Sequence, residues 1–78
     1  MMNEFIEKCK SIVAGYLGNP NMSKDEIFVV WSCKTLQNKK ALLSATAKGA
    51  PYFEITYNGD KDETYVDVYK KERNYVVK

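Results

Sequence analysis

The chain has 78 residues, of which 45% are hydrophobic and 28% charged, and a formal net charge of +2. This length predicts one domain over residues 1–78 with a small core, and the balanced composition excludes wholesale disorder. So weak a charge argues against a dedicated nucleic-acid binder, which usually carries a larger, clustered basic excess. No apolar run approaches the roughly 20 residues that span a bilayer, and no basic secretory start is present, so we expect a cytoplasmic protein without membrane contact.

Residues 3–17 predict an amphipathic helix, because apolar residues recur at spacings of three and four and so share one stripe. Asn3 suits the N-cap position. Gly18 and Pro20 predict the helix end, since glycine accepts the left-handed conformation and proline cannot continue a helix. The apolar stripe consists of Phe5, Ile6, Cys9, Ile12, Val13, Tyr16 and Leu17.

Two strands are predicted next. Ser23 and Glu26 favour a single helical turn through a capping box. Residues 27–35, IFVVWSCKT, then read as a strand whose start is almost continuously apolar, so we expect it to be central or covered on both faces there. Residues 40–47 would suit a helix equally well, but their place between two turns and beside a strong strand favours a strand. Residues 48–51, KGAP, predict a turn.

Residues 52–71 predict a β-hairpin with alternating faces. A four-residue loop over residues 59–62 gives an apolar inner face, whereas a tight Asn58-Gly59 turn would set Ile55 against Asp62; a one-sided core therefore favours the longer loop. The inner pairs are then Phe53 with Val68, Ile55 with Val66, and Tyr57 with Thr64. The outer pairs are Tyr52 with Tyr69, Glu54 with Asp67, and Thr56 with Tyr65.

These elements predict an α+β fold: one N-terminal helix packed on a four-stranded antiparallel β-meander, in the order α-β-β-β-β. Short connections favour pairing of strands in sequence order. A single helix shields one side of such a sheet, so the other side meets water or another molecule. The tail, ERNYVVK, is expected to add a short edge strand or turn, or to pack through Tyr75 and Val76.

The exposed side of the hairpin is the first candidate site. Like charges directly across a strand pair are unfavourable, so Glu54 and Asp67 predict either a neutralising lysine from a neighbouring strand or a basic partner. Tyrosines are enriched at recognition surfaces, although they also suit a solvated sheet face through their β-propensity. The predicted partner-binding or self-association residues are Tyr52, Glu54, Tyr65, Asp67 and Tyr69.

Two alternative sites remain open. Basic residues gather at one end of the predicted sheet, where single-stranded nucleic acid could stack on neighbouring aromatics, although the central acids would repel phosphate. This basic patch comprises Lys48, Lys70, Lys71 and Arg73. The other alternative is the bend after the first strand, where Gln37 and Asn38 serve either turn hydrogen bonds or, with Lys34 and Lys39, a recognition loop.

Catalytic and metal chemistry are not expected. The chain has no histidine, the commonest general base, and we find no phosphate loop or serine elbow. Cys9 and Cys33 fall on apolar phases and are predicted to be buried free thiols. Oxygen ligands alternate at the hairpin tip, but that segment is too short for a calcium loop, which favours a solvated tip. These ligands are Asn58, Asp60, Asp62 and Glu63. We therefore expect no enzyme, metal or cofactor.

The stretches VVWSCKTLQNKKALLSA and YFEITYNGDKDETYVDVYKK resemble a family of small proteins encoded by phages and prophages of Gram-positive bacteria such as streptococci and lactococci. The resemblance runs from about Ile27 to Lys71, and residues 31–38 are its most distinctive part. It implies a phage-derived protein in a bacterial cytoplasm and supplies no activity, ligand or site residue. We therefore predict a non-enzymatic accessory protein that binds a host or phage protein, with a homodimer possible and nucleic-acid binding as the alternative.

Overall fold

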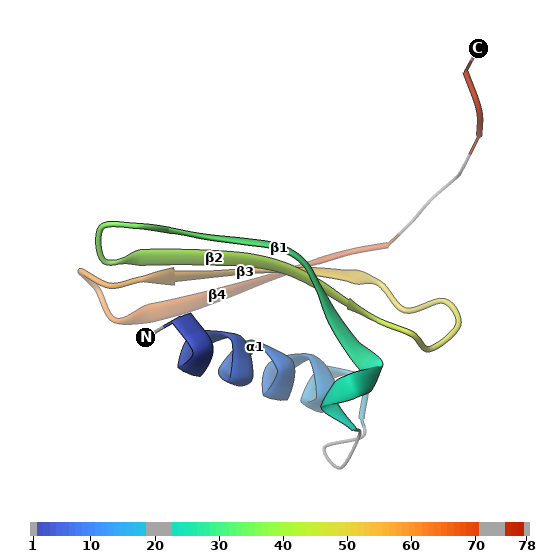
Figure 1. Cartoon of the computed structure of the whole chain (residues 1–78), viewed down its shortest axis with the longest axis horizontal. Coiled ribbons are helices and arrows are strands. Elements are labelled where there is room, and N and C mark those ends of the chain that lie inside the picture. Colours follow the sequence, from blue (N-terminus) through green and yellow to red (C-terminus); the bar gives the residue numbers. More distant parts are fainter. Residues whose placement is uncertain (1, 19–22, 71–74, 78) are drawn as a thin grey trace.

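The computed structural model describes residues 2–18, 23–70 and 75–77, and shows one helix lying across one face of an antiparallel sheet (Figure 1). The strand order β1-β2-β3-β4 confirms the predicted α+β meander. Its elements are the helix α1 (Met2–Tyr16), the 3-10 turn η1 (Lys24–Glu26), and the strands β1 (Ile27–Thr35), β2 (Asn38–Ala45), β3 (Tyr52–Asn58) and β4 (Glu63–Tyr69).

The helix ends where the sequence predicts, but Asn3 is not its N-cap, because the helix already includes Met2 and Asn3. Its buried residues are Phe5, Cys9 and Val13 of the predicted stripe together with Ala14, which the stripe did not include, and Cys9 and Val13 are fully enclosed. Gly18 adopts a φ of +78°, the left-handed conformation expected at the helix end, while the amide of Leu17 still donates to the carbonyl of Val13 at 3.0 Å. Tyr16 is 59% exposed. Its ring still contacts the ring of Phe53 in an edge-to-face arrangement.

The core lies between α1 and the inner face of the sheet, which is the face turned toward the helix (Figure 1). The inner-face side chains of β2 and β3 form its centre and are fully buried. They are Ala41, Leu43, Phe53 and Ile55. The strand at residues 40–47, the least certain by sequence, is therefore confirmed as β2, and its burial explains why small and apolar residues occupy it.

The expectation for β1 is wrong. It is an edge strand, not a central one, and Phe28, Val30 and Trp31 are each more than 40% exposed. The edge position follows from the strand order, and the exposure of Trp31 follows from a β-bulge: Val29 pairs with Leu43, yet Trp31 pairs with the adjacent residue, Leu42, so Val30 is an extra residue. The bulge reverses the alternation of faces along the rest of the strand.

The same bulge overturns the burial predicted for one cysteine. Cys9 is buried as expected, but Cys33 is exposed. Without a bulge, Cys33 would share the inner face with Ile27. With it, Cys33 pairs with Lys40 on the face away from α1.

The hairpin of β3 and β4 has the predicted register at every position, from Tyr52–Tyr69 to Asn58–Glu63. The side-chain oxygen of Asn58 accepts the amides of Asp60 and Lys61 at 3.0 and 3.2 Å and so shapes the loop. Beyond β4, Tyr75–Val77 are highly exposed and form no strand, so the edge strand expected of the tail is not found there. Residues 71–74 and 78 lie outside the described residues.

Candidate functional site

The face of the sheet opposite α1, here called the outer face, is the candidate site; no helix of the described chain covers it (Figure 1). The pairing of β3 with β4 brings all five predicted partner-binding residues onto this face. The pairing of β1 with β2 and of β2 with β3 adds residues from the other half of the sheet. The large side chains of the outer face are Phe28, Trp31, Leu42, Tyr52, Tyr65 and Tyr69.

One cross-strand row summarises the outer face. Trp31 of β1 pairs with Leu42 of β2, Leu42 pairs with Glu54 of β3, and Glu54 pairs with Asp67 of β4. The row therefore changes from aromatic and aliphatic at the β1 edge to acidic at the β4 edge. Trp31 is 42% exposed, although tryptophan is usually well buried.

The acidic half of this row is only partly neutralised. The ammonium of Lys40 on β2 lies 3.5 Å from a carboxylate oxygen of Glu54, which supplies the neighbouring lysine that the sequence predicted. The hydroxyl of Tyr69 donates to the other oxygen of Glu54 at 3.3 Å. Among the described side chains no cation forms an ion pair with Asp67, so this carboxylate leaves negative charge at the surface.

Acidic neighbours raise the pKa of both outer-face tyrosines of β4. The charge of Glu54 raises the pKa of Tyr69, with further contributions from partial desolvation and from Asp67. The pKa of Tyr65 is raised mainly by its hydrogen bond to Glu63, at 2.6 Å. A phenol is neutral at physiological pH in any case, and here both hydroxyls donate hydrogen bonds to carboxylates.

The sequence reasoning missed Trp31 and Phe28 as members of this surface. Strict alternation from the buried Ile27 points Trp31 toward the core, so the pattern does not place it on this surface. The unbroken apolar run of β1 was the available signal: three consecutive large residues, Val29 to Trp31, are compatible with a bulge as well as with two covered faces.

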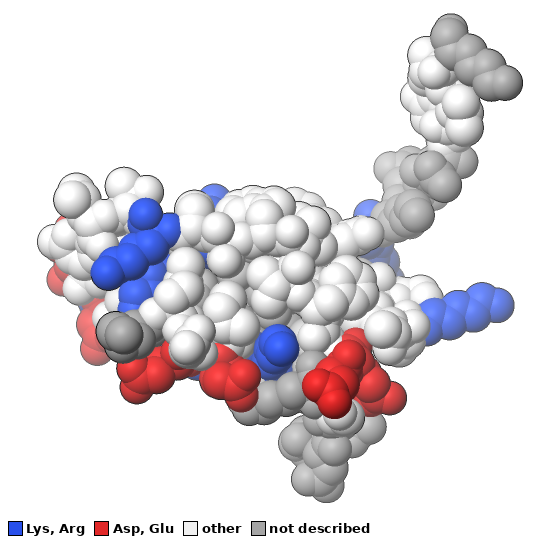
Figure 2. Space-filling view, viewed as in Figure 1, with Lys and Arg blue, Asp and Glu red and all other residues white. Residues whose placement is uncertain are grey.

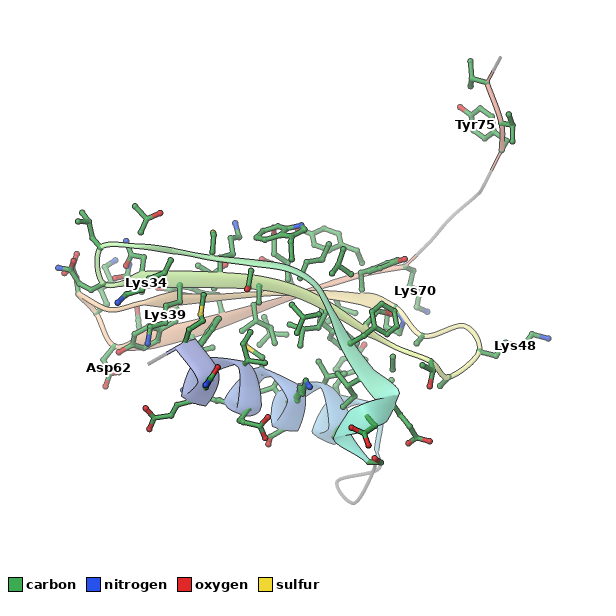
Figure 3. All side chains as sticks on the ribbon, in the orientation of Figure 1. Lys34, Lys39, Lys48, Asp62, Lys70 and Tyr75 are labelled. Carbon is green, nitrogen blue, oxygen red and sulfur yellow. The ribbon has the colours of Figure 1, made fainter. Side chains whose placement is uncertain are left out.

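The basic patch is only partly described. Lys48 and Lys70 lie at the same end of the sheet, as predicted (Figure 3), whereas Lys71 and Arg73 lie outside the described residues. An open hollow of about 490 Å³ is lined by Phe28 of β1, the end of β2 and the loop that follows it, Tyr52 of β3, and Lys70. Figure 2 shows no continuous basic surface on the side that it displays, where the lysines stand apart from one another and acidic side chains gather along the lower edge.

The bend after β1 serves a structural purpose. The side-chain amide of Gln37 donates to the carboxylate of Asp60 at 2.7 Å, and the amide of Gly59 donates to the side-chain oxygen of Asn38 at 3.1 Å. These bonds tie the β1–β2 turn to the β3–β4 loop. Gln37 and Asn38 thus make hydrogen bonds between turns, which favours the structural interpretation of this segment over a recognition loop.

A second hollow, of about 300 Å³, lies between the start of α1 and the sheet and is centred on Tyr57. The ammonium groups of Lys8 and Lys39 lie 5.9 and 5.8 Å from the centre of its ring. Its hydroxyl donates to Asp62 at 2.9 Å, a bond that raises the pKa of the phenol. Glu4 and Asp62 also line the hollow, so two acids accompany the two lysines. These charged side chains come from both α1 and the sheet and therefore connect the two.

The described residues contain no group of three potential metal ligands, and none of their helices is long and apolar enough to cross a bilayer. Residues 6–78 match DUF6275, which is described as a family of unknown function, and the chain therefore belongs to that family. Comparisons with curated proteins and with solved structures find no match.

Proposed function

For this member of DUF6275, we propose a non-enzymatic function: the protein binds a partner protein through its outer face. The observation that supports this most directly is the row Trp31–Leu42–Glu54–Asp67, in which an exposed tryptophan and a half-buried leucine adjoin two acids. Exposed apolar area that adjoins polar groups marks interaction surfaces, because covering it gains about 25 cal/mol per Å².

The chemistry of the row defines the partner. Its apolar half requires apolar side chains, and its acidic half requires a lysine or arginine close beside them. Since Lys40 already contacts Glu54, the open carboxylate of Asp67 is the position for the partner's cation. An aromatic anchor beside a charge-assisted bond is a common arrangement at binding hot spots.

The biological setting rests on the resemblance of residues 27–71 to proteins of phages and prophages of Gram-positive bacteria. It supports an accessory protein that meets a host or phage protein in the bacterial cytoplasm. The same row argues against nucleic acid as the ligand, because Glu54 and Asp67 lie midway along β3 and β4 on the face on which bases would stack.

The test is capture from a streptococcal lysate by four immobilised proteins: wild type, Trp31→Ala, Asp67→Lys and Asp25→Lys. Asp25 is an exposed acid in η1, on the helix side of the sheet, so Asp25→Lys matches the charge change of Asp67→Lys at a distant site. We expect one protein to be retained by wild type and Asp25→Lys and lost from the two outer-face variants.

The captured partner is then titrated against the purified wild type. Trp31 is the only tryptophan of the chain, so its fluorescence reports directly on contact at the outer face. We expect its emission to change on binding, and the affinity to fall as salt is added. Equal retention by all four proteins, or an unchanged Trp31 emission at saturation, would refute the outer face as the binding site.

A further inference from the structure

The β4 edge of the sheet is open to another strand. The described sheet has two edges, β1 and β4, and β1 is disrupted by its bulge, a common device against unwanted strand pairing. By contrast, β4 pairs with β3 over all seven of its residues without a register shift. Its sequence, ETYVDVY, contains neither proline nor lysine, and its two acids, Glu63 and Asp67, lie on the outer face, so no inward-pointing charge protects this edge.

The side chain of Val66 is incompletely buried at this edge. It lies on the inner face, since it pairs with the fully buried Ile55, yet 39% of it is exposed. The cause is the position of α1, which packs mainly over β2 and β1 and leaves the inner side of β4 less covered. An apolar side chain on the core side of an edge strand gains most from a strand added beside it.

We propose that a second copy of this chain adds its own β4, antiparallel, to this edge, with the two-fold axis at Val66. The two sheets then join into one continuous sheet through an isologous contact. In this register Val66 faces Val66 of the partner subunit, and Thr64 faces Val68 of the partner subunit. On the outer face, Tyr65 faces Asp67 of the partner subunit, and Glu63 faces Tyr69 of the partner subunit.

Charge and facing select this register from the alternatives. Sliding one β4 along the other by an odd number of residues would place inner residues opposite outer ones, and so bury Asp67 or expose Val66. The register can therefore differ only by an even number of residues. A two-fold at Tyr65 would set Glu63 against Asp67 of the partner subunit, and a two-fold at Asp67 would set that acid against its own copy. Like charges directly across a pair are destabilising. The register centred on Val66 has no such pair, and it is the two-fold register that pairs the whole of Glu63–Tyr69.

The dimer goes beyond the proposed function and does not depend on it. Joined at β4, the two outer faces become one surface, and the acidic ends of the two Trp31–Asp67 rows meet at the centre. A partner with two basic groups would then engage both copies.

The first experiment measures molecular mass by light scattering over a concentration series of the full chain. We expect the mass of the wild type to approach twice that of the monomer. The Val66→Lys variant should keep the monomer mass, because the two lysines would face each other at the two-fold axis. Val30→Lys is the matched control: the same change on the other edge, at a side chain 47% exposed, should leave the dimer intact. A monomeric wild type at every concentration, or a Val66→Lys variant as dimeric as wild type, would overturn the proposal.

The second experiment tests the register and does not depend on a charged variant that could fail to fold. In a Cys33→Ser background, which removes the exposed native thiol, Val66→Cys should form a disulfide-linked dimer under mild oxidation. Directly opposite Cβ atoms lie about 4.5–5.5 Å apart, near the reach of a disulfide. Thr64→Cys, which faces Val68 of the partner subunit, should cross-link far less. Equal or absent cross-linking would rule out the register. A monomer that still captures its partner would refute only the dimer, and a dimer that captures none would refute only the proposed function.

Discussion

Gly59 lies so close to Gln37 that no side chain fits between them. A Cβ on Gly59 would overlap the backbone carbonyl oxygen of Gln37 and lie 2.5 Å from its Cβ. The two residues belong to different turns, the β1–β2 turn and the β3–β4 loop, which lie at the same end of the sheet (Figure 1). Together with the bonds from Gln37 to Asp60 and from Gly59 to Asn38, this contact locks the two hairpins to each other.

Gly59→Ala should therefore destabilise the protein by about 1–3 kcal/mol, the usual cost of forcing an extra group into a packed site. The measurement is urea unfolding followed by circular dichroism. Gly15→Ala is the control, because nothing lies within 4 Å of the position its Cβ would take in α1. That variant should gain about 0.5–1 kcal/mol, since alanine is the better helix former. If Gly59→Ala is as stable as wild type, the two turns do not touch as described.

Leu36 is strained in the β1–β2 turn. It has a φ of +56°, which costs an L-residue other than glycine about 1–2 kcal/mol, and at 81% exposure it recovers little of this by packing. Leu36→Gly should raise the free energy of unfolding by up to about 1 kcal/mol, because the greater freedom of glycine in the unfolded chain offsets part of the gain. Leu36→Ala keeps the strain and should give no increase. A glycine variant less stable than the alanine variant would show that φ is not the source of strain.

The two cysteines should differ sharply in reactivity. Cys33 is exposed and Cys9 is buried, so a thiol reagent should modify one residue rapidly in the folded protein and two in denaturant. In the Cys33→Ser variant the rapid reaction should disappear. Rapid modification of two thiols under native conditions would contradict the packing of α1 against the sheet.

Cys9 also predicts a loss of stability in alkali. Burial raises the pKa of its thiol to about 11, so the unfolded chain loses this proton first as the pH rises. The stabilisation is complete below about pH 9 and is lost between pH 9 and 11. Urea unfolding across this range should show a shallower decline for Cys9→Ala than for wild type, although the cavity makes the variant less stable at neutral pH. Equal slopes would mean that the thiol is not desolvated.

Tyr69 should report the charge on Glu54. Because that charge is the largest cause of its raised pKa, Glu54→Gln should lower the pKa of Tyr69 and leave that of Tyr65 nearly unchanged. Glu63→Gln should have the opposite selectivity, since Tyr65 donates to Glu63. NMR titration of the ring signals measures both values. A Tyr69 pKa that stays unchanged in Glu54→Gln would show that the two side chains are apart in solution.

The β3–β4 half of the candidate site follows from the sequence. Apolar residues alternate in both strands, and only one register pairs Phe53 and Ile55 with Val68 and Val66. That register places the five predicted binding residues on one face: Tyr52, Glu54, Tyr65, Asp67 and Tyr69. Similarly, the three-and-four spacing of residues 3–17 was sufficient to predict the helix and its buried side. In both cases the information is local, because neighbours along the chain or across one short loop decide which side is apolar.

Residues of β1 could not be assigned in this way. Strict alternation from Ile27 points Trp31 and Cys33 at the core, and only the pairing with β2, through the extra residue Val30, turns them to the outer face. The contact of Gly59 with Gln37 and the exposure of Val66 likewise depend on how separate hairpins and α1 settle on one another. The sequence by itself determined the elements, the meander and the acidic half of the outer face. The tertiary structure decided its apolar half and its open edge, since a bulge and the placement of a helix depend on packing between segments distant in the chain.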